Sequence, residues 1–250
     1  MIYWFYAQYY VGMFILESSA SASITGFENP TLTFRKQALN LTQMFVYAPS
    51  SMFLIESTTE YVCSGIAIGD WLLIDASRQP LVNDIVLVEQ FDERYCVSWS
   101  QLCAHMKHAC HGQDDLLVIG VVTVSIHHFR KPISLPAHNS LIDIDLHSLL
   151  IDVEHSTLIC KADGESMRPY IFHHDLMLLE RHLKPGDDDV CILALNHDLV
   201  CKRVHLSSRL LSSDNPAYPD YRVTESDYLR LHGVVRYSFR LHRDVLCTDS

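Results

Sequence analysis

The sequence is short of basic residues and of long apolar runs. Its 19 lysines and arginines stand against 30 aspartates and glutamates, which gives a formal net charge of −11 over 250 residues. A surface of that sign is repelled by phosphate backbones, so direct binding of nucleic acid is not expected. No apolar run approaches the ~18 residues that a membrane-spanning helix needs. The acidic charge therefore argues against a nucleic-acid-binding protein, and the lack of long apolar runs argues against a protein with membrane-spanning helices.

The N-terminal stretch also lacks the positive charges of a secretory signal. It reads MIYWFYAQYYVGMFILESSASASITGF, an apolar run followed by small residues, but the first basic residue is Arg35. A secretory signal begins with a basic region, so export is the less favoured interpretation.

Cysteines are present, but not in the spacing of a disulfide framework. Most stand singly inside apolar runs such as VCILAL, where a reduced thiol behaves as a small hydrophobic side chain. The eight are Cys63, Cys96, Cys103, Cys110, Cys160, Cys191, Cys201 and Cys247. This pattern favours a reducing compartment, and we expect a cytoplasmic protein.

What the sequence does contain is an internal repeat. IAIGDWLLID at 66–75 matches IFHHDLMLLE at 171–180, and LNLTQMFVY at 39–47 matches IDLHSLLID at 144–152, both at an offset of 105 residues. LLVIGVVTVSIHHF, from residue 116, matches YLRLHGVVRYSFRLH, from residue 228, at an offset near 113. Three matched blocks in one order indicate two copies of a unit of about 100 residues.

Within each copy the pattern is mainly that of β-strands. The runs DIVLVEQF, RYCVSW, DVCILAL and DLVCKRVHL are short, apolar, and bounded by residues that favour turns. A short helix fits in each of the blocks that begin at residues 39 and 144. The segment FRKPISLPAHNS, with its two prolines, separates the copies. We therefore expect a mainly β protein with an N-terminal arm over 1–25, a first domain over 26–128, a linker over 129–141 and a second domain over 142–245.

The second copy carries a serine and a lysine that could form a catalytic pair. Ser166 lies in KADGESMRPY, and Lys202 follows 36 residues later inside the strand-like run HDLVCKRVHL. Strand alternation places Lys202 on the same face as Val200, so its amine is expected to be partly buried. Burial penalises the ammonium form, and a neutral amine can take a proton from a serine hydroxyl. From these residues alone, a turn serine and a lysine that extends into solvent is an open alternative.

Longer blocks around these residues carry a family resemblance. They are GESMRPYIFHHDLMLLE, GDDDVCILALNHDLVCKRV, DYLRLHGVVRYSF and, in the first copy, residues 26–75 with their Gly-Phe-x-x-Pro opening. Together they resemble the LexA/UmuD family of S24-type self-cleaving peptidases, and UmuD-like members in particular. The sequence departs from the family pattern at His174, where a glycine usually precedes the aspartate, and at Cys201, where a valine usually precedes the lysine.

The resemblance implies two tandem peptidase-fold domains of which only the second is active. It implies that Ser166 is the nucleophile of a serine peptidase, that Lys202 is the general base, and that the backbone N–H groups of Ser166 and Met167 are the oxyanion donors. The offset of 105 puts Tyr61 and Val97 in the corresponding places of the first copy. A phenol with no base beside it is not activated for acyl transfer in this mode, so the first copy is expected to be a degenerate domain.

By resemblance the protein would cut its own N-terminal arm during the SOS response. The corresponding bond is Thr25-Gly26. A RecA filament would prompt cleavage, and the product would serve a UmuC-like error-prone polymerase in translesion synthesis. The two copies could pair within one chain or between chains. No cofactor is implied.

Two alternative functions can be compared with this one. One is an intramolecular UmuD′-like dimer that no longer cuts and acts only as a polymerase-binding module. The other is a LexA-type repressor, which is not expected because about 25 residues before the first copy cannot hold a helix-turn-helix domain and because the charge is acidic.

One remaining cluster is rich in metal-ligating side chains. The segment CAHMKHACH contains Cys103, His105, His108, Cys110 and His111. Thiolates and imidazoles in this number would suffice for a tetrahedral zinc site. The spacing is not that of a zinc finger, so we expect a polar loop and no metal site.

Overall fold

The computed structural model describes residues 15–16, 40–108, 116–130, 134–136 and 139–243, and the structural statements below concern this part of the chain. It is mainly β, as expected from the sequence. The strands are β1 (Ile15–Leu16), β2 (Met52–Glu56), β3 (Trp71–Asp75), β4 (Ile85–Gln90), β5 (Glu93–Ser98), β6 (Leu116–His128), β7 (Thr157–Lys161), β8 (Leu176–Glu180), β9 (Asp189–Leu195), β10 (Asp198–His205), β11 (Leu210–Ser212), β12 (Tyr221–Arg222) and β13 (Leu229–Leu241). The helices are α1 (Leu41–Phe45), α2 (Trp99–His108) and α3 (Leu146–Leu150), with 3-10 turns η2 (Val62–Ser64) and η3 (Glu154–Ser156). None of these described helices has the length and apolar character required to cross a membrane.

The same strand order occurs twice. We call residues 40–128 the first half and residues 142–243 the second half. The order is β2-β3-β6-β4-β5 in the first half and β7-β8-β13-β9-β10 in the second, which β11 and β12 extend. The register repeats as well: Met52 lies opposite Asp75, and adding 105 to both numbers gives Thr157 opposite Glu180. The other strand pairings repeat in the same way, with residues of β3, β4 and β5 shifted by 105 and residues of β6 shifted by 113.

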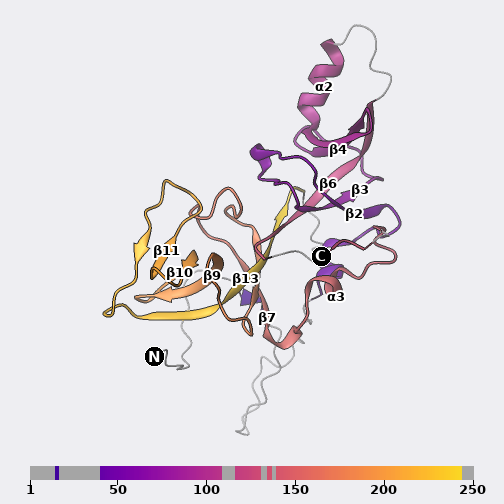
Figure 1. Ribbon diagram of the computed structural model, residues 1–250. Helices are drawn as coiled ribbons and strands as arrows, with labels where there is room; N and C mark the ends of the chain where they lie inside the picture. The colour runs from indigo at the N-terminus through magenta and orange to yellow at the C-terminus, as the bar shows by residue number, and fades with distance from the viewer. Residues whose placement is uncertain (1–14, 17–39, 109–115, 131–133, 137–138, 244–250) are drawn as a thin grey trace, which may run out of the picture.

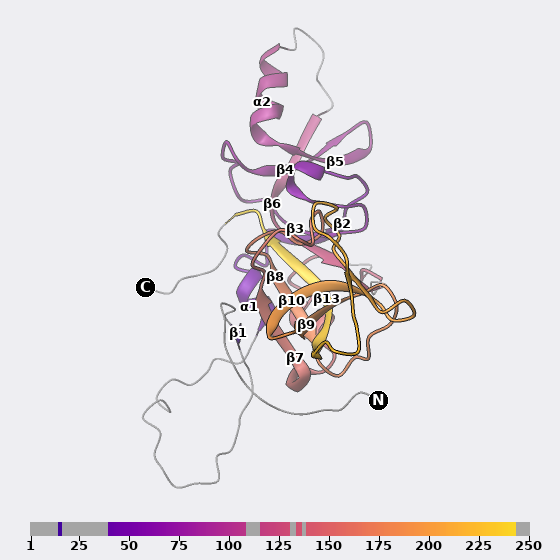
Figure 2. The same cartoon turned by 90° about the vertical axis from the view of Figure 1, so that its left-hand side faces the viewer.

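Strands β6 and β13 join the two halves. They are paired antiparallel, with Ile126 opposite Phe239 and Val124 opposite Leu241. Because β13 repeats β6 at an offset of 113, Ile126 and Phe239 are each other's counterparts. The pairing therefore has approximate two-fold symmetry about this point. Figures 1 and 2 show strands β2, β3 and β4 of the first half and strands β7, β9 and β10 of the second half on opposite sides of this junction.

The largest buried cluster straddles the junction. Helices α1 and α3 have only five residues each, too few to be stable without packing. Their N-terminal N–H groups are capped by the side chains of Asn40 and Asp145. Both halves supply side chains to the cluster, among them Leu41, Phe45, Trp71, Ile126, Leu146, Leu150, Tyr237 and Phe239. The two halves thus share one hydrophobic core.

The outer strands β2 and β7 are each covered by chain that precedes the other half. On β7, Ile15 lies opposite Cys160. On β2, the N–H of Leu54 donates to the carbonyl of Asn139 at 2.8 Å, so the end of the linker runs along the first half. A covered edge exposes fewer unpaired backbone groups. The leading segments of the two halves are thereby exchanged.

The structure differs from the expected polar loop at residues 103–108, which belong to helix α2, and residues 109–111 lie outside the described chain. Trp99 and Leu102 are three residues apart and share one helix face, which packs with Val86, Val88 and Val121 of strands β4 and β6. Apart from the half-buried Cys103, the remaining positions of the helix with described side chains are exposed, which is why the sequence pattern favoured a loop. Figure 1 shows α2 at the outer end of the first half.

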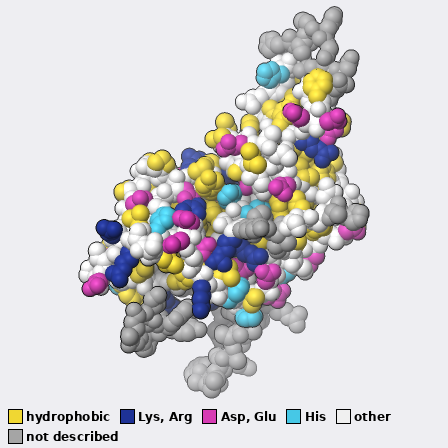
Figure 3. All heavy atoms as spheres, in the orientation of Figure 1, with side chains coloured by type: hydrophobic (Ala, Val, Ile, Leu, Met, Phe, Trp, Pro, Cys, Tyr) yellow, Lys and Arg dark blue, Asp and Glu magenta, His cyan; other side chains and the backbone are white. Residues whose placement is uncertain are grey.

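The surface carries both signs of charge in spite of the acidic total (Figure 3). Several guanidinium groups are bound to carboxylates of the second half: Arg130 to Asp189, Arg203 to Asp214 and Arg240 to Asp175. These arginines therefore serve to fix the fold rather than to form a free basic patch.

Candidate active site

Ser166 lies in a turn that the next residue anchors. The side chain of Met167 is 3% exposed and packs with Ile171 and Met177 between β7 and β8. The N–H groups of Tyr170 and Ile171 donate to the carbonyl of Met167 at 3.1 and 2.9 Å. Burial of Met167 explains the Ser-Met order, because it fixes the turn while Ser166 stays half-buried. The Ser166 hydroxyl makes no hydrogen bond to a described residue.

The two backbone N–H groups predicted as oxyanion donors are also without a described acceptor. In the same turn the N–H of Arg168 donates to the carbonyl of Glu165, whereas those of Ser166 and Met167 donate to no described atom. A pair of adjacent free N–H groups next to a serine hydroxyl is what an oxyanion site requires.

Lys202 lies in β10 opposite Cys191 of β9 and is half-buried, as predicted. Its Nζ donates to the Oγ of Ser213 at 2.5 Å and lies 5.9 Å from the ring centre of Tyr218. Burial lowers the pKa of Lys202 below its ordinary value, and this effect outweighs the opposite influence of Cys201 and Asp220. Lys202 makes no direct hydrogen bond with Ser166.

A short segment after β11 links the lysine to the serine turn. The N–H of Asn215 donates to the carbonyl of Ser166 at 3.0 Å, and its side-chain amide donates to the carbonyl of Glu165 at 2.9 Å. Two residues earlier, Ser213 accepts from Lys202. We call residues 213–215 the bridging segment. Ser166 and Lys202 are therefore connected through this segment rather than by direct contact.

The sequence interpretation did not identify the bridging segment. Its signal was the run SDNPAY, a cluster of turn-forming residues directly after the strand LLS. Finding Ser213 also required the register of β10 and β11, which the sequence pattern alone does not provide.

The first half has a different arrangement at the corresponding positions. Val97 lies opposite Val86, which is the register of Lys202 opposite Cys191 shifted by 105 residues. The hydroxyl of Tyr61 donates to Gln101 of α2 at 3.2 Å. Because β5 leads directly into α2, the described part of the first half contains no counterpart of the bridging segment.

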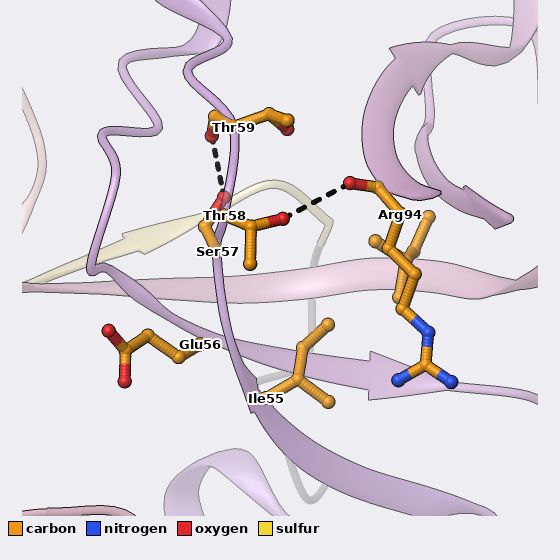
Figure 4. A pocket seen from close by; sticks show the side chains of 7 residues that line it. Ile55, Glu56, Ser57, Thr58, Thr59 and Arg94 are labelled. Atoms are coloured by element: carbon orange, nitrogen blue, oxygen red, sulfur yellow. Dashed lines mark hydrogen bonds between the residues drawn. The ribbon is translucent and has the colours of Figure 1, made fainter. Parts of the chain in front are cut away.

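Three hydroxyl residues of the first half line a small pocket (Figure 4). The hydroxyl of Ser57 donates to the carbonyl of Thr59 at 2.7 Å, and that of Thr58 donates to the carbonyl of Arg94 at 3.2 Å. The lining residues are Ile55, Glu56, Ser57, Thr58, Thr59, Leu87 and Arg94, and none of them is a lysine or histidine. Ser57 and Thr58 are thus engaged with backbone carbonyls rather than with a base.

The first half also contacts the turn that carries Ser166. The ring of His127 stacks on Tyr170 with centroids 4.7 Å apart. Arg240 of β13 binds Asp175 at 2.6 Å and donates to the carbonyls of Ser64 and Gly65 at 2.7 and 3.0 Å. The serine turn is therefore held partly by contacts across the junction.

Several predicted residues lie outside the described chain. These include Thr25 and Gly26 of the candidate scissile bond, and Cys110 and His111 of the Cys/His cluster. Within the described residues, no group of three or more His, Cys, Asp or Glu side chains is placed to hold a metal ion. The six cysteines with described side chains are free thiols.

Comparison with known proteins found a family match over the end of the linker and most of the second half. Residues 131–236 match the family described as Peptidase S24-like, and this range contains Ser166, Lys202 and the bridging segment. Protein SamA of Salmonella typhimurium (strain LT2) is 33% identical over 95 residues, which are 37% of this chain and 66% of SamA. The aligned part is thus slightly less than two thirds of the length of SamA. Both matches support the resemblance to the LexA/UmuD peptidases.

Proposed function

We propose that this protein is a UmuD-like self-cleaving serine peptidase whose site lies in the second half. The match of residues 131–236 to the family described as Peptidase S24-like supports this proposal. Ser166 is the nucleophile and Lys202 the general base. The observation that carries the proposal is the bridging segment, which ties a half-buried lysine of lowered pKa to the backbone of the serine turn.

In the proposed reaction, the neutral amine of Lys202 takes the hydroxyl proton of Ser166 while Oγ attacks the carbonyl carbon of the scissile bond. The N–H groups of Ser166 and Met167 donate to the oxyanion that forms. Lys202 then gives its proton to the leaving amine as the C–N bond breaks, and the acyl group stays on Ser166 as an ester. Water hydrolyses the ester with Lys202 again acting as base, which restores the serine.

Direct contact between the two side chains is not needed in the free enzyme. Hydrogen bonds between catalytic groups are often long or absent without substrate and tighten when it binds. The bridging segment limits how far Ser166 and Lys202 can separate, because Asn215 binds the serine turn and Ser213 binds the lysine.

The proposed substrate is the arm of the same chain, cut at Thr25-Gly26. Support comes from β1, which pairs with β7, the strand that leads into the Ser166 turn. At Leu16 the antiparallel register of β1 points away from the turn, so the proposal requires the chain to reverse direction between β1 and the scissile bond. Nine residues reach about 30 Å when extended. Gly26 leaves room for close approach of the backbone to the nucleophile.

We further propose that the two halves are UmuD-like domains paired within one chain, the first of them degenerate. The repeated strand register and the two-fold pairing of β6 with β13 support this interpretation. A covalent linker keeps the partners at high effective concentration, which favours pairing within the chain. Tyr61 and Val97 mark the degenerate site.

The wider role follows from the resemblance. A cytoplasmic protein of this kind would respond to a RecA filament during the SOS response. It would then act as accessory factor of a UmuC-like polymerase in translesion synthesis.

A second candidate is a paired module that does not cut and only binds or regulates a polymerase. One observation favours it: the amine of Lys202 is bonded to Ser213, and among the described residues the hydroxyl of Ser166 has no base within hydrogen-bond distance.

The two candidates are separated by the intact mass of the purified full chain. It is incubated at neutral and alkaline pH, with and without activated RecA filament, beside Ser166→Ala, Lys202→Ala and the control Tyr61→Phe. We expect the wild type and Tyr61→Phe to lose residues 1–25. In Ser166→Ala and Lys202→Ala we expect the cleavage rate to fall by about 1000-fold or more, because the nucleophile and the base act as a unit. An unchanged wild-type mass under all conditions would favour the non-cutting module, and cleavage that persists in Ser166→Ala would refute the assigned nucleophile.

A further inference from the structure

We propose that Ser213 is a positioning residue for Lys202, whose hydroxyl holds the lysine amine so that its lone pair faces Ser166. The inference rests on the proposed peptidase function and adds a third side chain to its site.

The contact follows from strand register. In the pair β10/β11, Arg203 lies opposite Ser212. One step further along both strands brings Lys202 opposite Ser213. Directly opposite residues of an antiparallel pair point to the same face of the sheet. β11 ends at Ser212, but the side chain of Ser213 still reaches the amine, with Nζ and Oγ 2.5 Å apart.

The two residues that follow Ser213 are both held by hydrogen bonds. The next residue, Asp214, accepts two hydrogen bonds from the guanidinium of Arg203 at 2.8 and 2.9 Å, and its side chain is 7% exposed. The residue after that, Asn215, binds the carbonyls of Glu165 and Ser166. Ser213 is therefore held at a defined place between the lysine strand and the serine turn.

An acceptor at this place has a specific effect on a lysine base. A neutral amine has one lone pair, and donation of an N–H to Ser213 restricts rotation about the Cε–Nζ bond. The same hydroxyl accepts more strongly from the ammonium group that forms when Lys202 takes the proton of Ser166, because hydrogen bonds from charged donors are stronger. Ser213 itself gains and loses no proton in either step.

The charged and titratable groups around Lys202 come from several elements. Cys191 of β9 lies opposite, Cys201 is adjacent on β10, the Arg203–Asp214 pair lies beside it, and Tyr218 and Asp220 follow the bridging segment. Burial lowers the pKa of Lys202 while Asp220 raises it. Removal of the Ser213 hydroxyl takes away an acceptor that favours the charged form, so the pKa of Lys202 should fall further.

The first test measures this pKa directly in the full chain. Lysine is labelled with 13C at Cε and titrated by NMR, with Lys202 assigned from the signal that Lys202→Arg removes. We expect Ser213→Ala to lower the pKa by about half a unit or more, and Ser213→Thr, which keeps a hydroxyl, to retain the wild-type value. Ser212→Ala is the matched control, because its hydroxyl is bonded to His205 at 2.8 Å. An unchanged pKa in Ser213→Ala would overturn the proposal.

The second test measures reaction of Ser166 with a fluorophosphonate probe as a function of pH, with the labelled residue identified by peptide mass. In Ser213→Ala we expect a plateau rate about 10-fold lower and a midpoint at lower pH, with both values restored in Ser213→Thr. Label on Ser213 instead of Ser166 would contradict a positioning role. Absence of any wild-type label, together with the expected change in the pKa of Lys202, would reject the peptidase function while supporting the contact.

Discussion

The two halves form the same turn around an aspartate, but a different side chain binds that aspartate in each half. In the first half, Asp70 accepts from the backbone N–H three residues before it at 2.8 Å and is bonded to His127 at 2.6 Å. In the second half, Asp175 accepts from the corresponding N–H at 2.7 Å but is bound by Arg240. His127 and Arg240 are counterparts at the offset of 113. The aspartate and its backbone contact are thus shared, and the partner side chain is not.

The same contrast holds at the candidate site. Val97 and Lys202 occupy one register position in the two halves, and Tyr61 and Ser166 one repeat position. The strands are retained around both pairs. The fold therefore depends on strand register and turn residues, and its strands form with or without the reactive side chains.

The largest expected effect comes from breaking the arginine clamp of the second half. Arg240→Ala leaves the buried Asp175 carboxylate without a cation and removes the contacts with Ser64 and Gly65. We expect a loss of about 3 kcal/mol in the free energy of unfolding in urea at pH 7. The counterpart His127→Ala loses the hydrogen bond with Asp70 and two ring contacts, with Phe129 and Tyr170, and should cost about 1 kcal/mol.

Two further results test the difference between Arg240→Ala and His127→Ala. The double variant Arg240→Ala/Asp175→Asn should recover part of the loss, because it removes the unpaired charge. Equal losses in Arg240→Ala and His127→Ala would contradict the greater role of the arginine at the junction.

A smaller effect is expected from His128, whose counterpart in the second half is Leu241. Burial lowers the pKa of His128 to about 4, and its ring lies 4.5 Å from Trp71 and 5.2 Å from Tyr237. Because the folded pKa lies below the ordinary value of 6.5, the neutral ring favours folding. That contribution is present above pH 6.5 and is lost as the pH falls toward 4.

His128→Leu introduces the residue of the other half and removes this titration. Between pH 6.5 and pH 4, the free energy of unfolding should decrease by about 2 kcal/mol less in His128→Leu than in the wild type. Urea unfolding across that pH range measures the difference. Burial also lowers the pKa of His242, so some acid sensitivity should persist in the variant. His155→Leu, at an exposed site, is the control, and an identical pH profile in His128→Leu and the wild type would contradict the assignment.

The smallest effect concerns His174 and its counterpart Gly69. Both have a positive φ, +75° and +87°, a conformation that costs less for glycine than for other residues. His174→Gly should stabilise the protein by about 0.5 kcal/mol, because relief of the backbone strain exceeds the added entropy of the unfolded chain. Gly69→Ala meets no atom within 4 Å, so its expected loss of about 1 kcal/mol isolates the backbone term. A shift of the urea midpoint in the opposite direction for either variant would refute this explanation.

Much of the secondary structure was predictable from local pattern. The runs assigned as strands are β4, β5, β9 and β10, and the short helices expected in the repeated blocks are α1 and α3. These elements follow from apolar periodicity and from turn residues close in sequence. Helix α2 was not predicted, because its main apolar contacts with the sheet are Trp99 and Leu102, and two residues are too few to give a helical periodicity in the sequence.

The candidate site was predictable only in part. Ser166 and Lys202 were selected from residue type, spacing and resemblance, and their catalytic roles remain a prediction. The partial burial and the direction of the pKa shift of Lys202 agree with its place on a strand. Ser213 was not selected, because a serine in a polar turn has no distinguishing sequence signal.

The mainly β fold class and the offsets of the repeat follow from the sequence alone, because they depend on residue types and on spacing along the chain. The candidate pair follows from residue type, spacing and family resemblance. The bond of Lys202 to Ser213, the contacts of Asn215 with the Ser166 turn and the pairing of β6 with β13 are seen only in the folded chain. Those contacts depend on the register of strands and on segments distant in the chain, and a shift by one residue would turn every side chain of a strand to the other face.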